Sequence, residues 1–334
     1  MIAARALPDH DAAMQPVAER TPDLDFRGLA EPTVFRGLAR DWPAVRASDP
    51  AAYLARFDQG AKINITVAPP TANGWLTYSA DLSRLDFERE PGTLPGLFAK
   101  LAAVAAESAP PAIAAQAVMV PETLPGFEAE NRLDLVPDGV APRIWIGNRV
   151  RVATHHDMNS NIAVVMAGRR RFTLFPPDQV ANLYIGPFEF TPAGTPVSLF
   201  DPDAPDLNRF PLAAEAIARA RVAELEPGDA IFIPHMWWHH VRSLDPVSIL
   251  VNYWWDEAPP RQPGLAPIDA MVHALLTFSG LPDNQRDAWR AMFDHFVFGA
   301  PPDHIPEAMR GIQGNLSEES KERVRRQLGQ MLGR

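Results

Sequence analysis

Proline occurs throughout this chain and limits the length of its helices and strands. The 334 residues include 35 prolines, which are scattered rather than gathered in one linker. Proline disrupts a helix interior and removes a hydrogen bond from a central strand, so it is confined mainly to turns, edges and first helical turns. The pattern favours many short elements, and therefore a β-rich body rather than a helical bundle.

Alternating and continuous apolar runs indicate where the strands lie. Residues 143–175 read as consecutive strands (RIWIGNRVRV, then NIAVVMAGRRRFTLF), and residues 230–255 read as three more (AIFIP, WWHHVRSL and SILVNYWW). The other expected elements are short strands at 33–35, 62–67 and 75–79 and helices at 94–106 and 212–225.

The sequence changes character after residue 258. Apolar residues there recur at helical spacing in IDAMVHALLTFSG, DNQRDAWRAMFDHFVFG and SEESKERVRRQLGQMLG. We therefore expect a first domain at 1–258, with a β core at roughly 110–256, and a helical extension at 259–334.

Charge and cysteine content exclude several kinds of function. The formal net charge of −10 and the pI near 5.4 argue against nucleic acid or an anionic membrane as a partner. The absence of cysteine excludes disulfides, thiolate metal sites and a cysteine nucleophile. No apolar run typical of a secretory signal or a membrane span is found, so we expect a cytoplasmic protein.

The stretch THHDMNSN, residues 154–161, places two histidines, an aspartate and two asparagines within otherwise apolar sequence. Alternate residues of a strand share a face, so His155 and Asp157 point together and His156 points away. Histidine and carboxylate at this spacing supply two ligands of a 2-His-1-carboxylate iron site. A polar strand end without a metal is the alternative.

The second histidine of such a site has to come from a distant strand. In EPGDAIFIPHMWWHHVRSL, residues 226–244, strand parity places His240 and Arg242 toward solvent and favours His239 as the ligand. A zinc site using His235 and His239 is an alternative, although the β-rich context argues against the helix that it needs. Trp237 and Trp238 are expected in the core and the pocket wall.

Arg170 in GRRRFTLFPP shares a strand face with Phe172 and Leu174, so its charge is expected to enter the core. A buried guanidinium needs an anion, and a bidentate carboxylate suits it best. That carboxylate is either an internal Asp or Glu or one belonging to a ligand. Asn161 and Asn252 also stand among apolar residues, and a buried amide has to be hydrogen-bonded.

These segments resemble the JmjC/cupin-like family of Fe(II)- and 2-oxoglutarate-dependent oxygenases, in the branch with the asparaginyl hydroxylase that inhibits hypoxia-inducible factor. The matching motifs are RGLARDWPA, IWIGN, HHDMNSN, AGRRRFTLFPPDQVANLY, EPGDAIFIPHMWWHHVRSL and VNYWW, in the family's order. The resemblance implies a double-stranded β-helix, or jelly roll, with flanking helices. It also implies a C-terminal extension that forms a homodimer.

The same resemblance assigns residues. His155, Asp157 and His239 match the iron ligands, which makes them the expected catalytic centre. Asn161 and Asn252 match asparagines near the 2-oxoglutarate.

Three positions depart from the family pattern or match it loosely. Arg170 replaces the lysine that grips the cosubstrate's distal carboxylate, and Val152 stands where a threonine is common. Gln116 takes the place of a tyrosine in the cosubstrate pocket.

The resulting expectation is an Fe(II)- and 2-oxoglutarate-dependent dioxygenase that hydroxylates a protein side chain or a small molecule and releases succinate and CO2. Two alternatives remain open. One is a metal-dependent cupin that does not use 2-oxoglutarate, and the other is a non-catalytic cupin-like binding module. Fold alone does not separate them, because function lies in the site.

Overall fold

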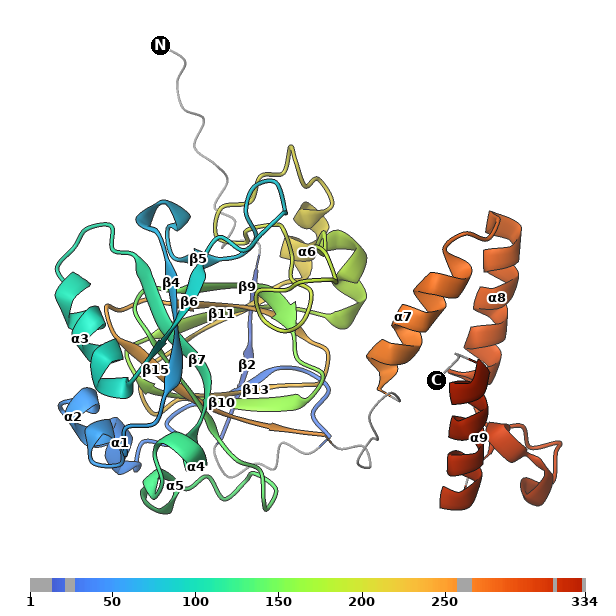
Figure 1. Ribbon diagram of the computed structural model, residues 1–334, viewed down its shortest axis with the longest axis horizontal. Helices are drawn as coiled ribbons and strands as arrows, with labels where there is room; N and C mark the ends of the chain where they lie inside the picture. Colours follow the sequence, from blue (N-terminus) through green and yellow to red (C-terminus); the bar gives the residue numbers. More distant parts are fainter. Residues whose placement is uncertain (1–13, 22–27, 257–265, 315–316, 332–334) are drawn as a thin grey trace, which may run out of the picture. The chain divides into compact units, whose positions relative to one another are not determined.

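The structure is a computed structural model that describes residues 14–21, 28–256, 266–314 and 317–331 (Figure 1). The chain divides into two compact units, residues 1–259 and residues 260–334. No helix within the described ranges is long and apolar enough to cross a membrane.

The first unit is built on two large mixed β-sheets. One has the strand order β1-β12-β11-β14-β9-β5 and the other β2-β3-β13-β10-β15-β8-β7-β4-β6. Strands far apart in sequence pair antiparallel, β9 with β14 and β10 with β15, as in a jelly roll. This confirms the predicted mainly β fold with flanking helices. The strands are β1 Gln15–Pro16, β2 Ala18–Arg20, β3 Thr33–Phe35, β4 Ile63–Ala68, β5 Trp75–Leu76, β6 Glu88–Gly92, β7 Ala112–Met119, β8 Arg143–Gly147, β9 Arg151–His156, β10 Ser160–Ala167, β11 Arg170–Phe175, β12 Arg221–Leu225, β13 Ala230–Ile233, β14 Trp238–Ser243 and β15 Ser248–Trp255.

An apolar core lies between the two sheets. It contains alternate residues of the central strands, among them Ala163 and Val165 of β10, Phe172 and Leu174 of β11, and Val241 of β14. Successive residues of a strand face opposite ways, so the other half of each strand packs outward. Each large apolar side chain buried in this way stabilises the fold by about 1.5–3 kcal/mol.

Short helices cover the outer face of the nine-stranded sheet. Leu94, Leu97 and Leu101 lie on one face of α3 and pack against the isoleucines of β7 and β8. The hydroxyl of Thr93 accepts a hydrogen bond from the backbone N–H of Gly96 and caps this helix, which confirms the helix predicted at 94–106. The helices of the first unit are α1 Pro43–Arg46, α2 Pro50–Ala55, α3 Leu94–Val104, α4 Val120–Thr123, α5 Phe127–Glu130 and α6 Ala213–Arg219, with 3-10 turns η2 Pro70–Ala72 and η3 Pro177–Asn182.

The connection between β11 and β12 covers the outer face of the six-stranded sheet. Its helix α6 buries Ala216 and Ile217 in one apolar cluster with Phe175 and Trp238. The predicted helix at 212–225 is therefore wrong in its second half, because Arg221–Leu225 form β12 and pair with β11. Ala223 and Leu225 alternate into the inter-sheet core, and this tertiary packing outweighs local helical spacing.

The second unit consists of helices, as its apolar spacing predicts. They are α7 Pro267–Phe278, α8 Asp283–Phe296 and α9 Glu318–Met331, with 3-10 turns η4 Glu307–Met309 and η5 Gly311–Gln313. No described residue in α7, α8 or α9 is buried. Leu276 and Met331 are each 80% exposed, so this unit leaves large apolar side chains uncovered.

Candidate metal centre

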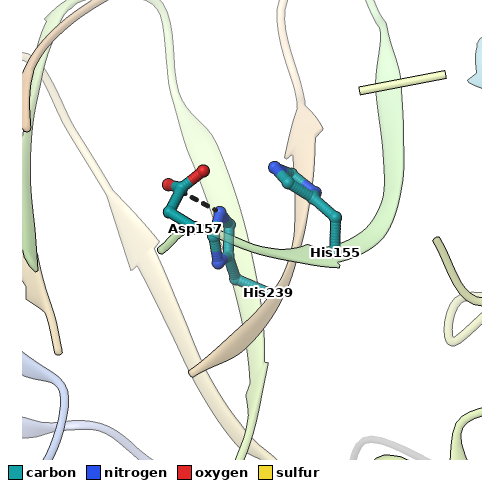
Figure 2. A group of neighbouring side chains, drawn as sticks. All are labelled: His155, Asp157 and His239. Atoms are coloured by element: carbon teal, nitrogen blue, oxygen red, sulfur yellow. Dashed lines mark ion pairs between the residues drawn. The ribbon is translucent and has the colours of Figure 1, made fainter. Parts of the chain in front are cut away.

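His155, Asp157 and His239 come together at the end of β9 and the start of β14. His155 lies directly opposite His239 in the antiparallel ladder, and their ring centroids are 4.3 Å apart. Asp157 follows β9, and its Oδ2 lies 3.6 Å from Nε2 of His239 (Figure 2). One ligand atom from each residue lies within 4.8 Å of the others. A single ion with bonds of about 2.0–2.2 Å can span such a set.

Hydrogen bonds orient both imidazoles for metal binding. Nδ1 of His155 lies 2.9 Å from the carbonyl oxygen of Ala153, and Nδ1 of His239 lies 3.1 Å from that of Trp237. Each Nδ1–H donates to its carbonyl, which leaves the Nε2 lone pair for a metal. Burial, with a smaller effect from His239, lowers the pKa of His155 to about 4. The imidazole is therefore neutral at pH 7, which is the form that binds metals.

A β-bulge in β9 sets the position of His155. His239 pairs with His155, but Val241 pairs with Val152, so β9 holds one extra residue between the two pairs. Val152 consequently packs inward beside Leu76 and Ala114 although it lies three residues before His155. Simple strand parity places these two residues on opposite faces.

The turn before β14 also contacts the site. Met236 has a positive φ of 65°, and its backbone N–H donates to the carbonyl oxygen of Asp157 at 3.1 Å. A non-glycine residue held in this conformation costs on the order of 1–3 kcal/mol, and such strain collects at functional sites. The bond fixes the β13–β14 turn against the segment that carries the carboxylate.

A directional chain of hydrogen bonds holds the carboxylate of Asp157. Nδ2 of Asn161 donates to Asp157 Oδ2 at 3.1 Å, and Nδ2 of Asn252 donates to Asn161 Oδ1 at 3.3 Å. Nε1 of Trp145 donates to Asn252 Oδ1 at 2.8 Å. An indole N–H only donates and a carboxylate only accepts, so the two ends determine the orientation of both amides. Asn161 therefore contacts Asp157 directly, and Asn252 contacts it through Asn161.

Sequence reasoning missed Trp145. It stands in an apolar strand, RIWIG, where a tryptophan reads as core. Its role in the hydrogen-bond network of Asp157 depends on the pairing of β8 with β15. This pairing puts Trp145 opposite Leu250 and within reach of Asn252. The available signal is that a buried indole N–H requires an acceptor.

Arg170 lies inside the core, where its charge has no carboxylate partner among the described residues. Its side chain is buried, Nε donates to Ser248 Oγ at 2.9 Å, and NH2 donates to the carbonyl oxygen of Trp145 at 3.3 Å. Among the described residues, no carboxylate lies within ion-pairing distance of it. Burial lowers the pKa of Arg170 to about 9, so the guanidinium is still charged at pH 7. The internal Asp or Glu partner is therefore not found in the described part of the chain.

The sheet register fixes how far Arg170 lies from the metal ligands. Leu174 pairs with His239 and Arg170 with Ser243, so Arg170 lies four residues, or about 13 Å, deeper along the barrel. The turn before β11 depends on Gly168, which has a φ of +67°. A Cβ at this position would overlap the carbonyl oxygen of Val247, so the close approach of β10, β11 and β15 requires glycine.

The remaining predicted site residues lie elsewhere. Gln116 sits in a bulge of β7 and accepts a hydrogen bond from Thr66 Oγ1 at 3.2 Å, and no described bond joins it to the three clustered ligands. Trp237 packs in the inter-sheet core, and its Nε1 donates to the carbonyl oxygen of Ala30 at 3.1 Å. Trp238 lies on the face of β14 opposite His239 and packs edge-on against His156. The structure does not bring the two tryptophans together as one wall.

The expectation that His240 faces solvent is wrong. His240 is fully buried, and its Nε2 lies 3.3 Å from Asp203 Oδ2, on the outer face of the six-stranded sheet. His235 is exposed, and among the described residues it does not group with His239 as a metal site. The outer face of this sheet is polar at His240 because the long connection supplies aspartates that sequence parity does not show.

This second cluster is an ion-pair network. Asp201 and Asp203 could hold a metal together with His240, but NH1 of Arg151 lies 3.0 Å and 3.5 Å from their carboxylates. Arg242 lies 3.5 Å from Asp203. Two guanidinium groups therefore already balance the two carboxylates and tie the β11–β12 connection to β9 and β14.

A jelly roll that gathers two histidines and a carboxylate at one end of its inter-sheet core is a metal-binding cupin in architecture. Comparison with known sequences gives the same class: residues 22–261 match the family described as Cupin-like domain. The chain therefore belongs to the cupin-like, JmjC-related family. This confirms the family recognised from the motifs. The likeness to the asparaginyl hydroxylase is a resemblance within that family.

Curated relatives match over part of the chain. HSPB1-associated protein 1 homolog of Danio rerio is 37% identical over 121 residues, which cover 35% of this chain and 26% of that protein. tRNA wybutosine-synthesizing protein 5 of Gallus gallus is 32% identical over 147 residues, covering 40% of this chain and 43% of that protein. Lysine-specific demethylase JMJ31 of Arabidopsis thaliana is 32% identical over 112 residues, covering 33% and 20%. Each match spans less than half of the relative's length.

Proposed function

We propose that this protein is an Fe(II)- and 2-oxoglutarate-dependent oxygenase that hydroxylates a substrate C–H bond. The observation that carries the proposal is the pairing of two features in one interior. Two buried histidines, whose Nε2 atoms take part in no described hydrogen bond, and a carboxylate converge at one end. A buried, charged arginine without a carboxylate partner among the described residues lies deeper in the same core. The names of the wybutosine-synthesizing and demethylase relatives support an enzyme of this kind.

The donor set fits iron. His155, Asp157 and His239 would hold Fe(II) as a 2-His-1-carboxylate site, a set that leaves positions open for other ligands. When bound, the metal supplies activation of O2 for oxidation of a C–H bond, with 2-oxoglutarate converted to succinate and CO2. The chain's own contribution is orientation: Asn161 fixes Asp157, and the backbone carbonyls fix both imidazole rings.

Arg170 would bind the distal carboxylate of 2-oxoglutarate. A guanidinium presents two parallel N–H donors to a carboxylate, and this pairing removes the cost of the unpaired buried charge. Ser248 and the carbonyl oxygen of Trp145 hold the guanidinium in place for it. Asn161 and Asn252 would line the cosubstrate site, with Gln116 and Thr66 on a neighbouring wall.

Two rival functions differ from this proposal in the residues that they require. A metal-dependent cupin that does not use 2-oxoglutarate has no need for a buried charge there, and a non-catalytic cupin has no need for three intact ligands. The substrate itself is proposed only by class, as a protein side chain or a small molecule.

We further propose that the C-terminal helices form a homodimer. Leu276, Phe298 and Met331 are each more than three-quarters exposed on a unit whose helices bury no described residue. Large exposed apolar patches mark association sites, and a second copy of the same helices offers a complementary apolar face.

The direct test of the oxygenase proposal is turnover of the cosubstrate. Purified protein supplied with Fe(II), 2-oxoglutarate and O2 is expected to form succinate even without its substrate, at a slow uncoupled rate. Asp157→Ala is expected to form none while keeping the circular dichroism of the wild type. Arg169→Ala, an exposed arginine paired with Asp245, serves as the matched control and is expected to keep the wild-type rate. Equal succinate formation by Asp157→Ala and wild type would contradict the proposal.

A further inference from the structure

A cavity lies on the outer face of the nine-stranded sheet, away from the metal ligands. It has a volume of about 400 Å³ and is lined by α5, by the segment that follows it to residue 140, and by Tyr253 of β15. Its volume lies within the range of small-molecule sites. Asn252, the neighbour of Tyr253, bonds to Asn161 in the interior, so the two residues face opposite sides of β15.

The charged groups of the cavity leave an excess of negative charge. Glu128, Arg132, Asp134 and Asp138 line it. Arg132 pairs with Asp134 at 2.5 Å. Among the described residues, neither Glu128 nor Asp138 has an ion-pairing or hydrogen-bonding side-chain partner. Two carboxylates therefore remain for a ligand.

Tyr253 adds a polar group that a ligand in the cavity can reach. Its side chain is only 5% exposed, and its hydroxyl makes no hydrogen bond to any described residue. Burial raises the pKa of Tyr253, and the nearby charge of Glu128 raises it further. The ring is buried while the hydroxyl is accessible from the cavity, so this oxygen is available to a ligand bound there.

The Glu128 carboxylate is itself partly withdrawn from water. Burial raises its pKa above the ordinary value. A neighbouring cation would offset the cost of this burial, and Tyr253 would supply an acceptor oxygen and an aromatic ring beside it. Guanidinium is the cation that combines several planar donors with weak hydration and stacking on aromatic rings.

We propose that this cavity binds a guanidinium group, presented by an arginine side chain of a peptide. Glu128 accepts a charge-assisted hydrogen bond from it, the Tyr253 hydroxyl oxygen accepts a second, and Asp138 adds negative charge at the rim. The site is separate from the proposed oxygenase centre and does not depend on it. Near the end of β15, Asn252 therefore faces the metal centre and Tyr253 faces this cavity.

The test uses the metal-free full chain and N-acetyl-arginine amide, followed by ligand-observed NMR at pH 7. A dissociation constant on the order of 1 mM is expected for a probe of this size. N-acetyl-citrulline amide, which is nearly isosteric but neutral, is expected to bind at least tenfold more weakly. Ethylguanidine is expected to bind more weakly than the arginine amide, because it lacks the peptide groups; tighter binding of ethylguanidine would overturn the peptide source.

Variants locate the binding. Glu128→Gln is expected to weaken binding of the arginine amide about tenfold, because one charge-assisted hydrogen bond is lost. Tyr253→Phe is expected to weaken it severalfold while leaving metal affinity unchanged. Glu122→Gln, an exposed acid on α4 outside the cavity, is the matched control and should bind as the wild type does. Equal binding of the arginine and citrulline probes, or wild-type binding by Glu128→Gln, would overturn the proposal.

Discussion

Replacing Arg170 with methionine is expected to stabilise the ligand-free protein. The fall in the pKa of Arg170 from 12.5 to about 9 corresponds to a cost of about 5 kcal/mol for keeping the guanidinium charged in the core. Methionine removes that cost but leaves Ser248 Oγ and the Trp145 carbonyl oxygen without their donor, at about 1 kcal/mol each. The net expectation is a gain of about 3 kcal/mol in the free energy of unfolding at pH 7.

The pH dependence has a definite sign. Arg170 is a base whose pKa is lower in the folded state than in the unfolded state. Its penalty is therefore complete below about pH 9 and is relieved as the pH rises from about 9 toward 12.5, where only the unfolded state keeps the proton. At pH 7 the penalty is complete, so the free energies of unfolding of wild type and Arg170→Met should differ by the full amount.

The assay is urea denaturation of both proteins at pH 7, with and without 2-oxoglutarate, using Mn(II) in place of Fe(II). Without 2-oxoglutarate the variant is expected to be the more stable protein. At a ligand concentration of about 100 times Kd, the wild type is expected to gain about 2.7 kcal/mol and Arg170→Met nothing. Arg169→Met, whose exposed guanidinium pairs with Asp245, is the control and should respond to 2-oxoglutarate as the wild type does. A ligand-free Arg170→Met that is less stable than wild type would refute the reasoning, because it would show that the charge already has a partner.

Three further outcomes are expected. Trp145→Phe removes the donor that orients Asn252. The Kd for Mn(II), measured by isothermal titration calorimetry, should therefore rise about tenfold. An unchanged Kd would show that the two asparagine amides do not control the orientation of Asp157. Burial tends to raise the pKa of Asp203, but His240, Arg242 and Arg151 outweigh it and lower that pKa to about 2. The carboxylate therefore contributes about 2 kcal/mol to the free energy of unfolding above pH 4, and this contribution is lost as the pH falls toward 2. Asp203→Asn should therefore lower stability in urea at pH 7, with a difference from wild type that narrows below pH 4; a difference independent of pH would contradict this. Leu276→Glu should shift the chain from dimer to monomer in sedimentation velocity, and a monomeric wild type would contradict the dimer proposal.

The sequence predicts those parts of the site that depend on local pattern. The strands that carry His155, Arg170 and His239 follow from apolar runs and turns, and the structure has each of them as β9, β11 and β14. The grouping of His155, Asp157 and His239 follows from ligand chemistry together with strand alternation, and the structure brings the three residues together.

Other features depend on pairing between distant strands, which local pattern does not contain. The bulge that turns Val152 inward is visible only in the register of β9 against β14. The burial of His240 follows from Asp203, which lies in the long connection and is 37 residues away in sequence. Helical spacing at 221–225 is misleading because β11 offers those residues an edge to pair with.

The most direct measurement is the visible spectrum of anaerobic, Fe(II)-loaded protein titrated with 2-oxoglutarate. Wild type is expected to develop a metal-to-ligand charge-transfer band. The band should be absent in His239→Ala, which loses a metal ligand, and weaker in Arg170→Ala, which loses the partner of the distal carboxylate. Wild-type protein with iron bound but no band, or an undiminished band in Arg170→Ala, would contradict the assignment of this site to 2-oxoglutarate.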